Sequence, residues 1–114
     1  MARSTSKSQD MSENDLLPRV RSIINAVEPE AQVILYGSRA RGEARRDSDW
    51  DFLILLEGPV DDTRTDRIRH SLYELEWETG EILCSIVLST RDWHSPERHA
   101  TPFCGAVERE GIAI

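Results

Sequence analysis

The sequence predicts an α/β (α+β) domain in which a small mixed β-sheet is covered by helices. Apolar residues recur at helical spacing in some segments and form short runs bounded by glycine or proline in others. These segments follow one another in the order α, β, β, α, β, α, which is typical of one sheet with helices packed against it. With 114 residues and 39% hydrophobic content, the chain is long enough for a single core.

The N-terminal part predicts a tail and then a helix. Residues 1–11 are rich in Ser, Thr, Lys and Gln, so we expect a disordered tail before a single domain over residues 12–114. With Asp15 as N-cap, Pro18 occupies the third helical position, where its missing N–H has no intrahelical acceptor. The helix ends before Pro29. Its apolar stripe, which should pack on the sheet, consists of Leu16, Leu17, Val20, Ile23, Ile24 and Val27.

Two short apolar runs predict neighbouring strands. Residues 32–36 are bounded by a proline and a glycine, which favours a buried strand. Residues 49–57 form a second run, which Gly58 and Pro59 end. Because apolar residues occupy both faces of this run beyond Asp51, we expect it to be a central strand.

A second long helix follows. Asp61 or Asp62 can cap it, and Gly80 ends it after Thr79. We expect its charged residues to face water. Its apolar residues are Ile68, Leu72 and Leu75, predicted to point inward, with Tyr73 and Trp77 beside them.

The C-terminal third predicts one more strand and one more helix. Residues 81–88 form the third apolar run, and a polar stretch follows it. Thr101 and Pro102 are a typical capped helix start, and Gly111 ends this last short helix.

Asp49 and Asp51 are the candidate catalytic and metal-binding residues. Because successive side chains of a strand point to opposite faces, both carboxylates should project from one face at the start of the second strand. Two adjacent anionic groups repel each other unless a cation lies between them. The pair therefore predicts one or two Mg²⁺ ions, which prefer oxygen ligands.

A glycine-serine turn precedes these carboxylates and suggests phosphate binding. The turn follows the first strand, so its backbone amides can bind phosphate oxygens, and a glycine lets the backbone approach them closely. Arginines concentrate positive charge in the next loop, although the net charge of the chain is -7. Individual arginines of this loop could instead be solvated or form salt bridges. The candidate nucleotide-binding residues are Gly37, Ser38, Arg39, Arg41 and Ser48.

Taken in order, these residues resemble a known signature. Gly37-Ser38, Ala40-Arg41-Gly42 and Ser48-Asp49-Trp50-Asp51 are similar to the GSxARG...SDxD pattern of the minimal nucleotidyltransferase family, in the DNA polymerase beta superfamily. The resemblance implies a polymerase beta-type fold and a Mg²⁺-dependent transfer of AMP from ATP to a hydroxyl group. It also implies a protein partner, a HEPN-type toxin that is modified or sequestered.

The third predicted strand departs from the family pattern. Members with full activity carry a third carboxylate there, whereas the matching position in this chain is Ser85, or else Cys84. Glu81 has the same strand parity as Ser85 but lies about 13 Å from it along an extended strand. A second hypothesis follows: a catalytically weak or inactive antitoxin-like module that neutralises its partner by contact.

Other site classes fit the sequence less well. An isolated D-x-D is usually a solvated turn, but here it follows a Gly-Ser turn at the family's distance. Asp47, Asp49 and Asp51 have the spacing of the first EF-hand ligands, yet Phe52 stands where that loop needs glycine. The Gly-Lys-Ser/Thr of a P-loop is missing.

Composition narrows the remaining classes. The negative net charge makes nucleic acid an unlikely partner, no apolar run is long enough to span a membrane, and we expect a cytoplasmic protein. Two cysteines are too few for a disulfide framework. His94, His99 and Cys104 match no standard zinc spacing, so we expect structural or surface roles for them.

Overall fold

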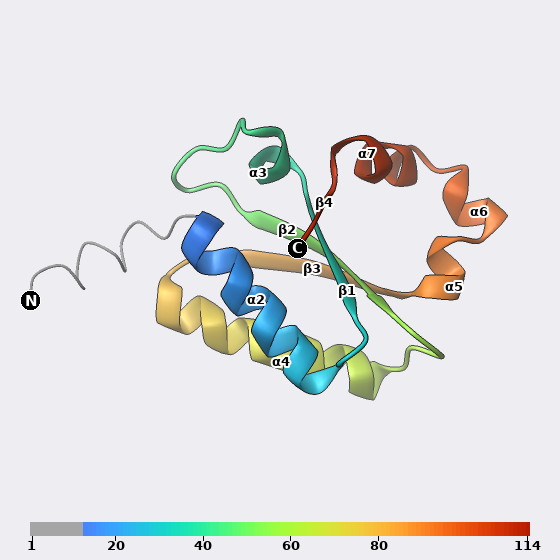
Figure 1. Cartoon of the computed structure of the whole chain (residues 1–114), viewed down its shortest axis with the longest axis horizontal. Helices are drawn as coiled ribbons and strands as arrows, with labels where there is room; N and C mark the ends of the chain where they lie inside the picture. Colours follow the sequence, from blue (N-terminus) through green and yellow to red (C-terminus); the bar gives the residue numbers. More distant parts are fainter. Residues whose placement is uncertain (1–12) are drawn as a thin grey trace, which may run out of the picture.

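The computed structural model describes residues 13–114, which form a four-stranded mixed sheet with helices on both faces (Figure 1). The predicted α+β class is confirmed, while the predicted tail over residues 1–11 lies outside the described residues. The strands are β1 (Gln32–Tyr36), β2 (Trp50–Leu56), β3 (Leu83–Ser89) and β4 (Ile112–Ala113). The helices are α2 (Glu13–Val27), α3 (Ser38–Arg41), α4 (Asp62–Thr79), α5 (Thr90–Trp93), α6 (Pro96–His99) and α7 (Pro102–Glu110).

The strand order is β3-β2-β1-β4, so β2 lies between two strands as predicted. β1 pairs antiparallel with both β2 and β4, whereas β2 and β3 run parallel. A parallel pair needs a crossover connection, and α4 provides it. Tyr36 of β1 lies opposite Asp51 of β2, and Cys84 of β3 lies beside Asp51 on the other side.

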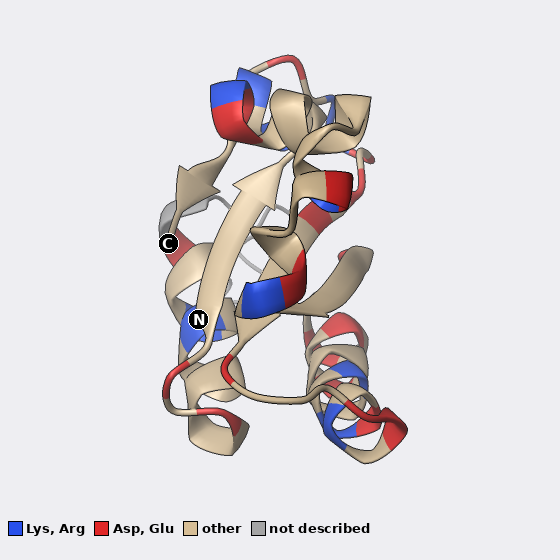
Figure 2. Ribbon diagram, turned by 90° about the vertical axis from the view of Figure 1, so that its right-hand side faces the viewer, with Lys and Arg blue, Asp and Glu red and all other residues tan. Residues whose placement is uncertain are grey.

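The two faces of the sheet hold separate apolar clusters. α2 and α4 lie alongside each other on one face, and α7 lies on the other (Figure 1). The even-numbered residues of β2, among them Phe52 and Ile54, are buried in the cluster that contains α2 and α4. Leu53 and Leu55 are buried with Trp93, Cys104 and other residues of the second cluster. Figure 2 shows that Asp, Glu, Lys and Arg lie mainly on the helices and loops around the largely uncharged strands.

The first helix differs from its prediction. α2 contains Glu13, so Asp15 is not its N-cap and Pro18 lies inside the helix. Leu16, Val20 and Ile24 are fully buried in the core, and this burial outweighs the local preference of proline for a helix start.

The other predicted helix signals are confirmed. The Asp61 side chain accepts a hydrogen bond from the Arg64 N–H at 2.9 Å, and Gly80 ends α4 in a left-handed conformation. Thr101 caps α7 by accepting from the Cys104 N–H at 3.2 Å. The sequence did not predict α5, α6 and β4. None of the described helices is long and apolar enough to cross a membrane.

An arginine joins the ends of both long helices. The Arg64 guanidinium donates to both carboxylate oxygens of Glu28, at 2.9 and 2.7 Å, and to the carbonyls of Glu57 and Pro59. These hydrogen bonds lower the pKa of Glu28. The paired charges therefore fix the end of α2 against the loop between β2 and α4.

Candidate functional site

Three side chains form a row across the sheet. Tyr36, Asp51 and Cys84 are in register on β1, β2 and β3, on the face that α7 covers. Asp49 precedes β2 and is exposed beside them. The two predicted carboxylates are therefore on the same face, and Phe103 of α7 contacts the Tyr36 ring edge-on at 5.3 Å between centroids.

Cys84, rather than Ser85, stands next to the aspartates. Its sulfur lies 3.8 Å from Oδ2 of Asp49, while Ser85 is in register with Phe52, whose side chain belongs to the opposite face. The sequence could not determine this because a shift of one residue in the register reverses the faces of the strand.

Glu81 does not supply a third carboxylate. It accepts a hydrogen bond from the Trp50 indole N–H at 2.9 Å and lies 3.8 Å from the Arg39 guanidinium. Trp50 belongs to the cluster with α2 and α4, so Glu81 is held on the face away from Asp51. The site thus has two carboxylates, of Asp49 and Asp51, and the thiol of Cys84 at the N-terminal ends of β2 and β3.

These groups accumulate negative charge. Burial raises the pKa of Asp51, and the nearby Asp49 raises it further, while Arg41 acts in the opposite direction. Burial also raises the pKa of the Cys84 thiol, with both aspartates adding to the effect. A bound cation would relieve this repulsion, so the electrostatics fit a divalent metal ion.

Gly37 is fitted against the carboxylate of Asp51. Its φ of 80° and ψ of -160° lie in a region that is almost exclusive to glycine. A Cβ at this position would lie 2.5 Å from Oδ2 of Asp51, which is a severe overlap. Ser38 follows as the first residue of α3. The predicted Gly-Ser turn therefore lies directly beside the carboxylate.

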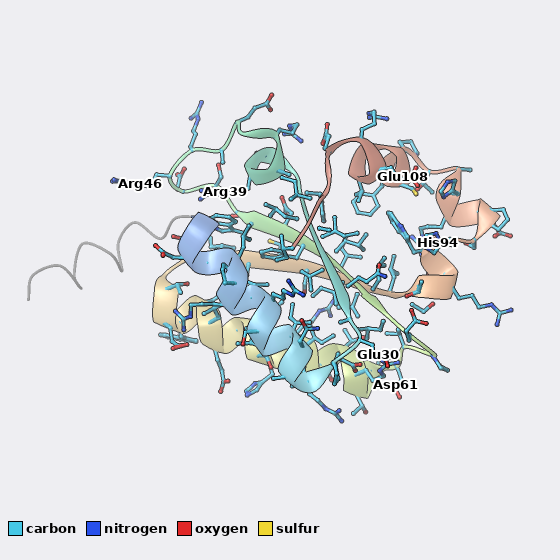
Figure 3. The ribbon with its side chains drawn as sticks, in the orientation of Figure 1. Glu30, Arg39, Arg46, Asp61, His94 and Glu108 are labelled. Carbon is cyan, nitrogen blue, oxygen red and sulfur yellow. The ribbon has the colours of Figure 1, made fainter. Side chains whose placement is uncertain are left out.

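Arg39 shapes the loop between α3 and β2. Its Nη2 donates to the carbonyls of Arg46 and Ser48, at 3.1 and 2.9 Å, and its guanidinium lies 4.1 Å above the Trp50 ring. Figure 3 shows Arg39 and Arg46 at the same loop. The Ser48 hydroxyl accepts from the Arg45 N–H at 2.8 Å. The structure thus places Arg39 and Ser48 in contacts within the loop, and among the described residues the Arg39 guanidinium pairs with Glu81 rather than with Asp49 or Asp51.

Arg41 lies on the side of the aspartates. Its guanidinium is paired with Glu43 at 2.8 Å and with Glu110 of α7 at 3.3 Å, and its charge lowers the pKa of Asp51. Because Arg41 is exposed, it can exchange these carboxylates for another anion, such as a phosphate.

A second group of metal-binding residue types lies on α6 and α7. The structure brings together His99, Cys104 and Glu108, with one ligand atom of each within 4.8 Å of the others. His99 Nδ1 lies 3.6 Å from the Cys104 sulfur, and His99 Nε2 lies 3.5 Å from Glu108. Glu108 was not predicted because no sequence spacing connects it to His99. His94 is not part of this group.

Comparison with known proteins identifies relatives. A sequence model of the nucleotidyltransferase domain matches residues 17–89. A Haemophilus influenzae protein described as "Probable protein adenylyltransferase MntA" is 35% identical over 60 residues, which cover 51% of this chain and 53% of that protein. The aligned part is thus about half of this curated relative.

Solved structures share the fold. A toxin-antitoxin with AMP-PNP has a TM-score of 0.58 at 18% identity, over 84% of this chain and 69% of that chain. An MntA-HpeT variant with two aspartates changed to glutamate gives 0.58 at 15% identity, with the same coverage of both chains. A variant of that pair with a tyrosine changed to alanine gives 0.59 at 16%, over 86% of this chain and 70% of that chain. At these sequence identities, the structural similarity shows that this chain shares the fold of those proteins and no more.

Proposed function

The chain belongs to the nucleotidyltransferase domain family, and we propose that it transfers AMP from ATP to a hydroxyl group of a partner protein. The curated relative is described as a protein adenylyltransferase, which supports this donor and a protein acceptor. The toxin-antitoxin neighbours support a toxin as the protein partner, and the HEPN type of that toxin is proposed from the resemblance to the minimal nucleotidyltransferase family alone. We place this reaction in the cytoplasm.

The contact between Gly37 and Asp51 carries the proposal. Because Gly37 has no side chain, a triphosphate can come close to the backbone and to the carboxylate at the same point. Asp49 and Asp51 offer oxygen ligands for one or two Mg²⁺ ions on this side of the sheet. Ions held by these two carboxylates would supply positive charge that stabilises the pyrophosphate leaving group.

The remaining residues bind or position the nucleotide in this proposal. The Ser38 hydroxyl donates to a phosphate oxygen, and Arg41 leaves Glu43 or Glu110 to pair with the triphosphate. Arg39 and Ser48 contribute indirectly, since they hold the loop that leads into Asp49.

Cys84 supports a second candidate function. With the Cys84 thiol where a third carboxylate would lie, the site beside Asp49 and Asp51 lacks one oxygen ligand and one general base. The chain could then retain the fold and its affinity for a partner without turnover. In this alternative it is an antitoxin-like module that neutralises the partner by contact.

The transfer of label from α-labelled ATP to a HEPN-type partner in the presence of Mg²⁺ tests the first function. We expect Asp49→Asn to abolish both labelling and neutralisation of the partner, because a metal ligand is lost. Asp47→Asn is the matched control, since Asp47 is an exposed acid of the same loop. Neutralisation that persists without labelling in Asp49→Asn would contradict the enzymatic function and support contact inhibition.

A further inference from the structure

We infer that His99, Cys104 and Glu108 form a binding site for one zinc-type transition-metal ion, apart from the carboxylates proposed to hold Mg²⁺. His99 ends α6, and the other two residues lie on α7. One ligand atom of each lies within 4.8 Å of the others, and no other group of three His, Cys, Asp or Glu within residues 13–114 meets this spacing. The inference does not depend on nucleotidyl transfer, because it concerns different residues.

The distances suit a single ion. Zinc–nitrogen bonds measure about 2.0–2.1 Å and zinc–sulfur bonds about 2.3 Å, so a nitrogen and a sulfur on one ion lie at most about 4.4 Å apart. His99 Nδ1 is 3.6 Å from the Cys104 sulfur, within this limit. Cys104 and Glu108 are four residues apart on α7 and therefore project from the same side of that helix. An ion between Nδ1 and the sulfur would thus have the Glu108 carboxylate as its neighbour.

The turn between α6 and α7 holds the first two ligands in place. The Thr101 hydroxyl donates to the carbonyl of Arg98 at 2.7 Å and accepts from the Cys104 N–H at 3.2 Å. Because Arg98 directly precedes His99, the same side chain fixes the backbone on both sides of the site. An ion would therefore find these two ligands already positioned, and binding costs little ordering.

Solvent reaches the site from one side. The Cys104 side chain is fully buried, whereas the side chains of His99 and Glu108 are 52% and 51% exposed. Glu108 now lies 3.5 Å from His99 Nε2, and its exposed side chain can turn toward the ion without disturbing the core. Three protein ligands leave the fourth position of a tetrahedral ion for water.

The donor set selects the class of ion. An imidazole and a thiolate bind Zn²⁺ and similar transition-metal ions, whereas Mg²⁺ takes oxygen ligands in a near-ideal octahedron. When the ion binds, the Cys104 thiol loses its proton to solvent and the sulfur donates an electron pair to the ion. No atom changes its oxidation state, so the step needs no redox partner.

An ion at this site would join α6 to α7. The Phe103 ring of α7 also contacts Tyr36 beside the candidate nucleotide site. Because a ligand that binds only the folded form stabilises it, Zn²⁺ should raise the melting temperature of the chain.

Cobalt titration of the full, untagged chain tests the inference through the near-ultraviolet thiolate-to-cobalt absorption, followed by displacement with Zn²⁺. We expect the band in the native chain and its loss in Cys104→Ser. Cys84→Ser is the matched control and should retain the band, since Cys84 is the other cysteine of the chain. Excess Mg²⁺ should not remove the band.

Exposed ligands provide variants that do not alter the core. His99→Gln and Glu108→Gln should each weaken cobalt binding by more than the roughly 10–100-fold that follows removal of an outer-sphere partner. His94→Gln and Glu97→Gln are the matched controls, because both residues are exposed nearby and neither belongs to the group. Zn²⁺ should raise the melting temperature of these controls but not that of His99→Gln.

Four results would overturn the inference. The first is a native chain without the thiolate band, and the second is a band that Cys84→Ser removes and Cys104→Ser retains. The third is an equal rise in melting temperature with Zn²⁺ in the native chain and in His99→Gln. The fourth is a loss within the outer-sphere range for Glu108→Gln, which would show that Glu108 only orients the imidazole. Circular dichroism verifies that each variant is folded.

Discussion

The two faces of the sheet differ in what covers them. The face toward α2 and α4 is closed by two long helices and by large buried side chains such as Trp50 and Phe52. The face toward α7 has a smaller apolar cluster, and beyond it lie Asp49, Asp51 and the thiol of Cys84. Because β2 alternates between these faces, one short strand contributes the core on one side and the candidate site on the other.

Residues that stabilise the fold and residues with a candidate chemical role therefore lie mainly on different faces of the sheet. Side chains of the face toward α2 and α4 should determine the free energy of unfolding, since they include the largest buried apolar groups. The face toward α7 carries the neighbouring carboxylates of Asp49 and Asp51, whose repulsion opposes folding. A bound ligand of opposite charge would relieve this repulsion. Substitutions on the two faces should therefore have different consequences.

The largest effect on stability is expected for Phe52→Ala. Phe52 is fully buried between the sheet and the helices, so its removal should lower the free energy of unfolding by about 3–5 kcal/mol. Urea denaturation measures this change. Ile86→Ala is a control from an edge of the same sheet, 36% exposed, and should cost much less. Equal losses for both variants would show that the two faces do not differ in this way.

Gly37→Ala should have the next largest effect, because it combines backbone strain with overlap on Asp51. The conformation of Gly37 costs a non-glycine residue about 1–3 kcal/mol, and the carboxylate must also move. We expect weaker nucleotide binding as well as a lower melting temperature.

Gly42→Ala is the matched control for Gly37. Gly42 also has a positive φ, of 74°, but a Cβ there meets nothing within 4 Å. It should lose about 1 kcal/mol and retain nucleotide binding. If both variants bind nucleotide equally well, close approach at Gly37 is not part of the site.

A smaller effect, dependent on pH, is expected at Glu28. Hydrogen bonds from Arg64 lower its pKa in the folded protein, so the pair stabilises the fold above the unfolded pKa of about 4.5. This stabilisation is lost as the pH falls through the lowered folded value. Glu28→Gln should therefore reduce stability at neutral pH and flatten the loss of stability in acid, measured by thermal melting between pH 7 and pH 3. An unchanged acid slope would argue against this role of the pair.

The smallest effect is expected for Trp77→Ser. Trp77 is 75% exposed although it lies on α4, and substitutions at such positions usually change stability by less than about 0.5 kcal/mol. Chemical denaturation provides the measurement. A loss above 1 kcal/mol would mean that the exposed end of α4 is covered in solution.

The sequence predicted the main elements because their signals are local. The caps at Asp61 and Thr101 and the stop at Gly80 are where the pattern places them. Period-two alternation likewise placed Asp49 and Asp51 on one face. Two errors concern tertiary structure: Pro18 is held inside a helix by burial of its neighbours, and Cys84 replaces Ser85 through the register of β3 on β2.

The roles of the arginines also depended on tertiary structure. Arg39 and Arg41 are two residues apart on α3, yet one lies over Trp50 and the other pairs with Glu110 of α7. Both belong to one charged loop in the sequence, so no local pattern could assign them to different sides of the sheet.

The pKa of Asp51 gives a sign for its effect on stability. Burial raises that pKa, so the folded protein holds its proton more tightly than the unfolded chain does. The contribution of Asp51 to stability therefore falls as the pH rises from its unfolded pKa through the raised folded value. At neutral pH, replacement of the charge by a neutral amide should not destabilise the protein.

Calorimetric titration with ATP, with and without Mg²⁺, is the most direct test when the native chain is compared with the Asp49→Asn, Asp51→Asn double variant. The account predicts Mg²⁺-dependent binding in the native chain and none in the variant, with an equal or higher melting temperature for the variant. Unchanged binding in the variant would contradict the assignment of the site. A fall in melting temperature as large as that of Phe52→Ala would contradict the separation of stability and chemistry between the two faces.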